Sequence, residues 1–317
     1  MQGSMRGVSP HFVRSSKGPV KPVRIALFAP GSNERVMAKA LDSGVDAVIL
    51  DLEDSVPVAA KQEARALVSK VIDGLAAPGA LRIRPAVFVR VNGAATGLLD
   101  DDLAAIVRPG LDAVLLPKAD TVAQVKDAAA SLDRLESARG IGHGTIEIIL
   151  MIESALGVYR CFDLINASPR VASTCIGVAQ DGDLQTDLGC GWSVEGTELL
   201  YARSKVLLDT RAAGKPYPLD GVFSNLGDEE ALIKDSRLSA RLGFVGRTVI
   251  HPRQIAPVRK AYAVPDEEVA YYRKVVAQFE AVEKTGTAAA ITVDGKLVDY
   301  AMFQRAKRVL ELAKLDR

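Results

Sequence analysis

Three carboxylates crowd the end of one short apolar segment of this sequence. Asp51, Glu53 and Asp54 come directly after the residues AVIL. Like charges this close repel one another, so positive groups are needed nearby to offset them. Arg90 and Lys118 stand at the ends of two other apolar runs and can supply that charge. The pattern predicts a site where acids and bases from separate segments converge, with Asp51 and Lys118 in orienting or structural roles.

Two further acids have the residue type and position of metal ligands. Glu153 follows the run EIILMI, and Asp183 lies in the loop after the next apolar run. A few hard oxygen ligands suit Mg²⁺, which keeps several waters and shares its remaining positions with substrate. Zinc is not expected, because the three histidines are scattered and have no cysteine partners. The alternative is that Glu153 and Asp183 are only ion-pair partners in a polar pocket.

Short strands must hold these side chains in place. From Val23 onward, apolar runs alternate with amphipathic helical stretches, as in a parallel sheet with crossover helices. The predicted strands are 24–29, 46–51, 86–91, 112–117, 147–152, 173–179, 219–224 and 247–252, and the predicted helices include 33–42, 59–72, 121–135 and 197–213. This predicts an α/β fold of the (β/α)₈ TIM barrel type, whose chemistry lies at the carboxyl ends of the strands. A doubly wound sheet is the alternative.

The chain divides into three predicted parts. Residues 1–22 are small, polar and rich in glycine and are predicted to be a flexible N-terminal tail, while residues 23–262 form the barrel. Residues 263–317 are predicted to be an extension, with helices over 265–284 and 300–315 and a tight hairpin at the Asp-Gly pair between them. Such a piece buries little by itself, so we expect it to pack on the barrel or on a neighbouring subunit.

Composition and charge argue against several classes of protein. A net charge of +1 with intermixed acids and bases leaves no basic stripe for nucleic acid. No apolar run approaches the roughly 20 residues of a membrane span, and the first residues lack the apolar core of a signal peptide. Three cysteines without a C-x-x-C pair fit reduced thiols. We therefore expect a cytoplasmic protein that binds neither nucleic acid nor membrane.

Nine segments, in order along the chain, resemble the HpcH/HpaI aldolase and citrate lyase superfamily. They are LFAPGSNERV (27–36), AVILDLEDSV (47–56), VFVRVNG (87–93), AVLLPKAD (113–120), MIESALGV (151–158), DGDLQTDLG (181–189), ELLYARSKVLL (198–208), IHPRQI (250–255) and VDGKLVD (293–299). The sequence is most similar to the citrate lyase β-subunit-like branch, which includes malyl-CoA and citramalyl-CoA lyases. The resemblance implies an Mg²⁺-dependent lyase, homotrimeric or a dimer of trimers, that cleaves a 3-hydroxyacyl-CoA to acetyl-CoA and a 2-oxo acid, or condenses the two.

The resemblance also implies roles for single residues. Glu153 in the I-E-[ST] motif and Asp183 in the G-x-x-D-L motif correspond to the metal ligands of the family. Arg90, in R-[VI]-N, corresponds to the arginine that grips the carboxylate or oxo group of the substrate. Glu53 and Asp54 are expected in the substrate-binding site, holding Arg90 and metal-bound water.

The resemblance also places a catalytic acid/base in the C-terminal extension. Asp299 follows the hairpin and corresponds to the residue that relatives donate across a subunit interface. The competing interpretation is that Asp299 only caps the helix that follows it.

Two departures from the family pattern bear on the choice of branch. The free 2-oxo-acid aldolases carry a histidine where this chain has Asp54, which makes a class II aldolase the weaker alternative. Relatives often have a glutamate where this chain has Gly182, and Asp181 is the residue that could replace it. A malyl-CoA thioesterase and a citrate lyase β subunit that needs an acyl carrier partner stay open as alternatives. Arg35 and Lys61 are weak candidates for contacts with the CoA portion.

Overall fold

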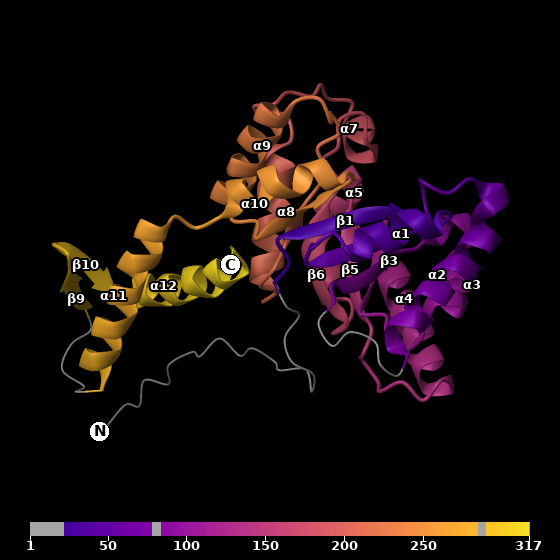
Figure 1. The fold of residues 1–317 in the computed structure, drawn as a ribbon, viewed down its shortest axis with the longest axis horizontal. Helices are drawn as coiled ribbons and strands as arrows, with labels where there is room; N and C mark the ends of the chain where they lie inside the picture. Colours follow the sequence, from indigo (N-terminus) through magenta and orange to yellow (C-terminus); the bar gives the residue numbers. More distant parts are fainter. Residues whose placement is uncertain (1–21, 78–83, 285–289, 317) are drawn as a thin grey trace.

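Eight parallel strands close into a barrel in the computed structural model, which describes residues 22–77, 84–284 and 290–316 (Figure 1). The strands are β1 (Ile25–Pro30), β2 (Ala47–Asp51), β3 (Ala86–Arg90), β4 (Ala113–Pro117), β5 (Glu147–Ile152), β6 (Val171–Ile176), β7 (Leu219–Asp220) and β8 (Gly246–Val249). Because β1 pairs with both β2 and β8, the sheet has no edge. The predicted TIM barrel is confirmed, and the doubly wound sheet is excluded. All but the last residue of the predicted tail lies outside the described residues.

Alternation along each strand sorts side chains between two apolar clusters. In β2, Ala47 and Ile49 belong to the cluster inside the barrel, whereas Val48 and Leu50 belong to the layer between sheet and helices. All four are buried, as expected for a strand covered on both faces. The strand's last residue, Asp51, is thereby held at the barrel mouth.

Helices surround the barrel and mostly match the predicted ranges. They are α1 (Glu34–Leu41), α2 (Lys61–Ala76), α3 (Leu99–Ile106), α4 (Val122–Ala138), α5 (Ala155–Tyr159), α6 (Cys161–Asn166), α7 (Asp183–Leu188), α8 (Leu200–Ala212), α9 (Glu229–Leu242) and α10 (Ile255–Tyr262). None of the helices among the described residues is long and apolar enough to cross a membrane. The three cysteines are free thiols.

Strand β7 is much shorter than the predicted 219–224. The carbonyl of Gly221 accepts hydrogen bonds from Nε and Nη2 of the buried Arg247, at 3.0 and 2.7 Å, instead of continuing the ladder. A Cβ at position 221 would lie 2.4 Å from the carbonyl oxygen of Ile176, so glycine is required for this close approach.

The C-terminal extension is an arm that projects from the side of the barrel (Figure 1). It consists of α11 (Asp266–Glu283), the antiparallel pair β9 (Ala290–Val293) and β10 (Lys296–Asp299), and α12 (Tyr300–Ala313). It buries more by itself than expected, with a cluster of its own formed by Val275, Phe279, Val293, Val298, Phe303 and Ala306. Its packing on a neighbouring subunit stays a prediction.

The far end of α12 fastens the arm to the barrel floor, opposite the mouth. Arg24, just before β1, donates to the carbonyl of Leu312 at 3.2 Å and forms an ion pair with Asp316 at 3.1 Å. Leu312 also packs against the cluster inside the barrel. Since α12 rises by about 20 Å over its length, Asp299 at its start lies well away from the barrel.

Candidate active site at the barrel mouth

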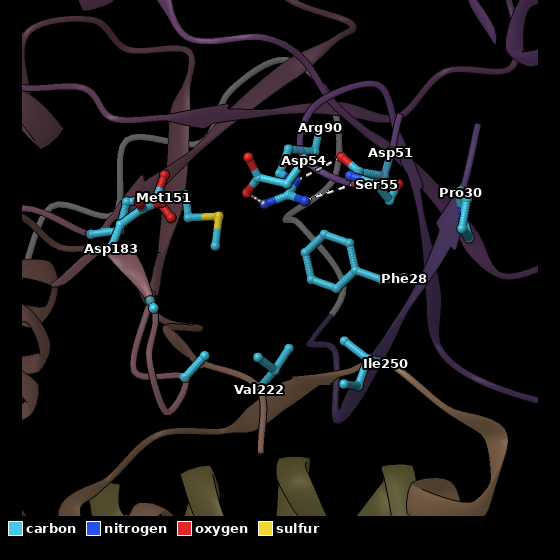
Figure 2. Close-up of a pocket in the computed structure, with 14 residues that line it drawn as sticks. Phe28, Pro30, Asp51, Asp54, Ser55, Arg90, Met151, Asp183, Val222 and Ile250 are labelled. Carbon is cyan, nitrogen blue, oxygen red and sulfur yellow. Dashed lines mark hydrogen bonds and ion pairs between the residues drawn. The ribbon is translucent and has the colours of Figure 1, made fainter. Parts of the chain in front are cut away.

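A cavity of about 300 Å³ opens at the carboxyl ends of the strands (Figure 2). Its charged lining comes from four strands and the loops that follow them. The lining residues are Phe28, Pro30, Asp51, Asp54, Ser55, Arg90, Met151, Glu153, Gly177, Ala179, Gly182, Asp183, Val222 and Ile250. Arg90, Asp54, Glu153 and Asp183, all predicted from sequence, therefore meet in one cavity, whereas Glu53 lies behind its wall.

Arg90 is held by three acids at the end of β2 and just after it. Its Nε and Nη2 donate to Oδ1 and Oδ2 of Asp51, both at 2.7 Å, and its Nη1 lies 2.8 Å from Glu53 Oε2 and 3.3 Å from Asp54 Oδ2. The guanidinium also stacks over the ring of Phe28, 4.9 Å from its centroid. Asp51 therefore has the orienting role predicted for it, and the flat edge of Arg90 that could grip a substrate carboxylate through two bonds is already occupied by Asp51.

The pKa values of these groups follow from burial and pairing. Burial would raise the pKa of Asp51, but the hydrogen bonds and charge of Arg90 outweigh it and hold that pKa below its usual value. Burial raises the pKa of Glu53, and the charges of Arg90 and Lys118 reverse only part of this rise. Asp51 is thus the principal counter-ion of Arg90.

Lys118 connects several acids of the site. Its Nζ lies 2.9 Å from Glu53 Oε1 and 3.2 Å from Asp183 Oδ2, while its backbone N–H donates to Glu153 Oε1 at 3.2 Å. Its φ of 50° is in the left-handed region, which is uncommon for a residue with a side chain. This backbone turn aims both the N–H and the ammonium at acids of the mouth.

Glu153 and Asp183 fit the chemistry of a divalent-cation site. Glu153 is only 4% exposed, and burial together with the charge of Glu53 raises its pKa to about 8. A carboxylate that is costly to ionise without a partner is well suited to a cation. Asp183, half exposed at the start of α7, lines the same cavity and supplies a second hard oxygen donor.

Close packing explains the glycines beside these two carboxylates. A Cβ at Gly177 would lie 2.7 Å from the Cβ of Glu153, so only glycine lets the end of β6 pass this carboxylate. A Cβ at Gly182 would lie 3.0 Å from the carbonyl oxygen of Ala179, a contact tighter than nine in ten real ones. Asp181 is exposed and is not among the lining residues, so the described structure does not support it as a substitute carboxylate.

Asp299 does not reach the mouth of its own barrel. It lies on the projecting arm, is exposed, and accepts a hydrogen bond from the backbone N–H of Met302 at 2.8 Å. Within one chain it is the N-cap of α12. A catalytic role for Asp299 therefore requires a second subunit.

The two candidates for CoA contacts lie in different surroundings. Lys61 is buried and donates to the carbonyls of Leu52 and Glu53, both at 2.7 Å, so it braces the loop after β2. Arg35 is exposed near the N-terminus of α1.

The sequence prediction missed the apolar residues of the cavity. Phe28, Met151, Val222 and Ile250 line it, although in sequence they resemble ordinary core residues. Their positions near the carboxyl ends of strands do not distinguish them, because an apolar residue there can equally face the core.

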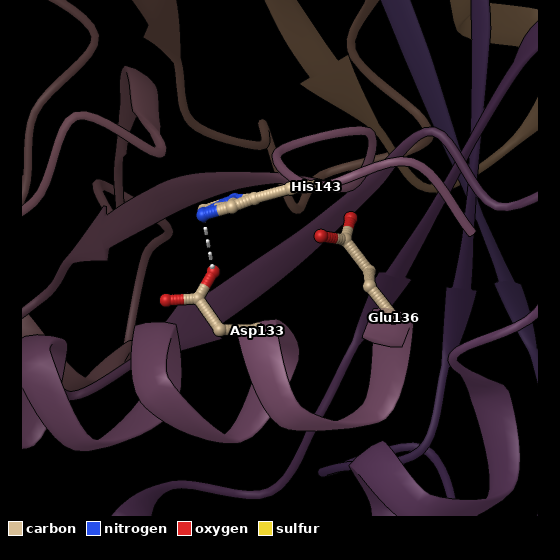
Figure 3. A group of neighbouring side chains, drawn as sticks. All are labelled: Asp133, Glu136 and His143. Carbon is tan, nitrogen blue, oxygen red and sulfur yellow. Dashed lines mark ion pairs between the residues drawn. The ribbon is translucent and has the colours of Figure 1, made fainter. Parts of the chain in front are cut away.

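A second group of potential ligands lies at the other end of the barrel (Figure 3). Asp133, Glu136 and His143 have ligand atoms within 4.8 Å of one another. Arg170 forms ion pairs with both acids, and Glu136 also accepts from the backbone N–H groups of Gly144 and Ile146. Since a fixed guanidinium already balances these acids, the group is a structural link between α4 and β5.

Comparison with known proteins places this geometry in a family. Residues 24–252 match the HpcH/HpaI aldolase/citrate lyase family, and residues 208–315 match the C-C bond lyases of the TIM-barrel fold. The citrate lyase subunit beta of Leuconostoc mesenteroides is 36% identical over 92% of this chain and 94% of its own. The human mitochondrial citramalyl-CoA lyase is 27% identical over 92% of this chain and 86% of its own.

A solved structure agrees with both matches. The protein CitE from Mycobacterium tuberculosis, in complex with magnesium, acetoacetate and coenzyme A, superimposes with a TM-score of 0.69 at 29% identity, covering 92% of this chain and 98% of its own. The family predicted from sequence motifs is confirmed. The chain belongs to the HpcH/HpaI aldolase/citrate lyase family and is a carbon–carbon lyase.

Proposed function

We propose that this enzyme cleaves a 3-hydroxyacyl-CoA, such as malyl-CoA or citramalyl-CoA, into acetyl-CoA and a 2-oxo acid, or condenses the two. The observation that carries the proposal is that Glu153, Asp183 and Arg90 line one cavity at the mouth of the barrel. The names of the human relative and of the ligands in the M. tuberculosis structure support a CoA thioester as the substrate class.

Mg²⁺ is the cation that we propose for this site. Glu153 and Asp183 would hold it, since both are oxygen donors that line the cavity. When bound, the ion would supply a Lewis acid that polarises oxygen atoms of the substrate. Lys118 adds a fixed positive charge beside Asp183.

Arg90 is the proposed anchor for the substrate carboxylate. Among the described residues, the second N–H of its Nη2 has no partner, so a carboxylate can accept one charge-assisted hydrogen bond there. The two hydrogen bonds that Arg90 donates to Asp51 keep the guanidinium from rotating. This fixed orientation lowers the entropic cost of positioning the substrate.

The reaction conserves atoms and charge with one proton donor and one acceptor. The bond between the hydroxyl-bearing carbon and the α carbon of the thioester breaks, the hydroxyl passes its proton to solvent water at the open mouth, and its oxygen becomes the oxo group of the 2-oxo acid. The bond electrons pass into the thioester enolate, which takes a proton on carbon to give acetyl-CoA. We assign that proton to Asp299 of the partner subunit, and in condensation the same carboxylate removes it.

Apolar surfaces support an assembly of several copies, for which we propose a homotrimer or a dimer of trimers. At the tip of the arm, Leu297, Tyr300 and Met302 are all at least half exposed around Asp299. Exposed apolar side chains also occur on α5, α6, α7 and α8, of which α5 begins two residues after Glu153 and α7 begins at Asp183. They include Leu156, Tyr159, Phe162, Leu188, Tyr201 and Leu208. Contiguous exposed apolar residues are typical of protein–protein contacts.

Product analysis with a panel of thioesters tests the proposed function. We expect malyl-CoA or citramalyl-CoA to give acetyl-CoA and a 2-oxo acid with Mg²⁺ and to stay intact with EDTA. Free CoA with an intact hydroxy acid would instead identify a thioesterase. Absence of turnover by the folded protein, with activity appearing only on an acyl carrier protein, would identify a carrier-dependent citrate lyase subunit.

A further inference from the structure

The cavity has two chemically different walls (Figure 2). Asp51, Asp54 and Arg90 lie along one side together with Asp183, and Phe28 stacks against Arg90, whereas Val222 and Ile250 lie on the opposite side of the open centre. Among the described residues that line the cavity, Arg90 is the only one with a positively charged side chain, and it lies on the charged side. The opposite side is built of hydrocarbon.

Charge around the cavity is already negative. Five carboxylates, those of Asp51, Glu53, Asp54, Glu153 and Asp183, face two fixed cations, Arg90 and Lys118. A divalent cation bound at Glu153 and Asp183 would offset this excess of carboxylates and leave no surplus positive charge for a second anion. One substrate carboxylate has a place beside that ion and the free N–H of Arg90, but a second carboxylate would meet repulsion there.

The side chains of Val222 and Ile250 offer no hydrogen-bond donor to a second carboxylate either. Their neighbour His251 accepts a hydrogen bond at Nδ1 from the backbone N–H of Arg253, at 3.1 Å, and is not among the residues that line the cavity. Gln254 is likewise committed to the carbonyl of Phe223 and the N–H of Ile250. An anion placed against this wall would lose water without gaining a partner, which is costly.

We propose that the enzyme is selective for thioesters whose released 2-oxo acid carries a small uncharged alkyl group, such as methyl or ethyl, and that it rejects those whose oxo acid carries a second carboxylate. The inference rests on the proposed function and names its substrate class. With the carboxylate of the oxo acid at Arg90, its alkyl group lies toward Val222 and Ile250. A substrate whose oxo acid carries a hydrogen in place of the methyl leaves this wall uncovered, so we expect it to bind several-fold more weakly.

Relative kcat/KM values for citramalyl-CoA and citryl-CoA with Mg²⁺ test the selectivity. Their cleavage products are pyruvate and oxaloacetate, which differ at this position by a methyl against a carboxymethyl group. We expect citramalyl-CoA to be preferred by about 100-fold or more, because rejection rests on an unpaired charge rather than on size. A citryl-CoA value equal to or above that of citramalyl-CoA would overturn the inference and leave the lyase function intact.

Binding without turnover separates this inference from the proposed function. Calorimetry with the Mg²⁺-loaded protein compares pyruvate and 2-oxobutyrate with oxaloacetate, and we expect the two monocarboxylates to bind at least about tenfold more tightly. If no thioester is cleaved but this order holds, the lyase function fails and the selectivity of the cavity stands. Tighter binding of oxaloacetate would contradict the selectivity directly.

A variant with a positive charge on the apolar wall tests the cause. Ile250 is 41% exposed, so Ile250→Lys can place an ammonium at the wall without burying it. We expect the citryl-CoA to citramalyl-CoA ratio of kcat/KM to rise by about tenfold or more, while the matched variant Ile250→Met keeps the original ratio. The inference fails if Ile250→Lys still cleaves citramalyl-CoA and shows an unchanged ratio.

Discussion

Asp51 and Arg90 are joined by two parallel hydrogen bonds of 2.7 Å at the end of neighbouring strands β2 and β3. Both side chains are buried, and the pairing fixes the plane of the guanidinium that lines the cavity. Asp54 also contacts Arg90, but at 3.3 Å and with a side chain that is 60% exposed. The two acids should therefore contribute very differently to the fold and to the site.

Replacing Asp51 by Asn should destabilise the protein and misplace Arg90. Breaking a buried ion pair leaves a charge without its partner, at a cost of about 3 kcal/mol in the free energy of unfolding. Asp54→Asn is the matched control and should cost less than about 1 kcal/mol, since exposed pairs contribute little. Denaturant unfolding of both variants measures these free energies. Equal losses of stability would show that Asp51 contributes no more to the fold than Asp54 does.

Glu153→Gln and Asp183→Asn should each abolish most of the metal affinity without unfolding the protein. Each substitution removes one of two protein oxygen donors, so we expect Mn²⁺ binding to weaken by about 100-fold, measured by electron paramagnetic resonance. Glu147→Gln is the control, because Glu147 lies on the same strand as Glu153 but at its opposite end. Unchanged Mn²⁺ affinity in Asp183→Asn would show that Asp183 is not a metal ligand.

Loss of the Lys118 ammonium should strengthen metal binding. The ammonium lies 3.2 Å from Asp183 Oδ2 and repels a cation bound there. Removing one positive charge near the ion, in a partly exposed site, should raise affinity by about tenfold in Lys118→Met, while Lys118→Arg keeps the charge and the wild-type affinity. Calorimetric titration with Mg²⁺ measures both. Weaker binding in Lys118→Met would instead mean that Lys118 mainly holds Glu53 and Asp183 in place.

The charged half of the site could be predicted from sequence, and the apolar half could not. Asp51, Arg90 and Glu153 stand where an uninterrupted apolar strand ends, and in a parallel barrel all such positions open on one face. Val222 and Ile250 carry no such signal, because an apolar residue after a strand looks the same whether it faces core or cavity. The position of Val222 depends on how β7 ends, which the close packing of Gly221 decides.

The long-range contact that fixes the direction of the arm could not be predicted from the sequence either. The hairpin and helices followed from local turn chemistry and periodicity, and both were found. The direction in which the arm projects depends on the contact between Arg24 and Asp316, which are 292 positions apart. No local pattern encodes such a pair.

Glu147 should make stability fall as pH rises. Burial raises its pKa to about 7, above the ordinary 4.5, with the charge of Lys215 reversing part of the rise. Between these values the folded protein holds a proton that the unfolded chain has lost, so this contribution to stability is present below about pH 4.5 and is lost as pH rises through about 7. Glu147→Gln should therefore raise Tm by about 2–4 °C at pH 8 and leave it unchanged at pH 4.5. The prediction is wrong if the Tm values of the wild type and of Glu147→Gln change with pH in parallel.

Asp299→Asn should abolish turnover and leave stability and metal binding unchanged. Asparagine caps a helix about as well as aspartate does, so α12 keeps its N-cap, but the amide cannot transfer the proton. Loss of stability with retained turnover would mean that Asp299 serves only as a cap.

Mixed oligomers of two inactive variants decide whether Asp299 acts across a subunit interface. The Asp299→Asn chain keeps an intact barrel mouth, and the Asp183→Asn chain keeps an intact arm. A site that combines the mouth of the first chain with the arm of the second therefore contains every proposed group. Random co-assembly at equal amounts should restore about a quarter of the wild-type activity, because both neighbours must be of the right kind. If Asp299 served its own barrel, no mixture could regain activity, since each chain lacks one group. The arm's length and its attachment to the barrel floor through Arg24 make restoration the expected result.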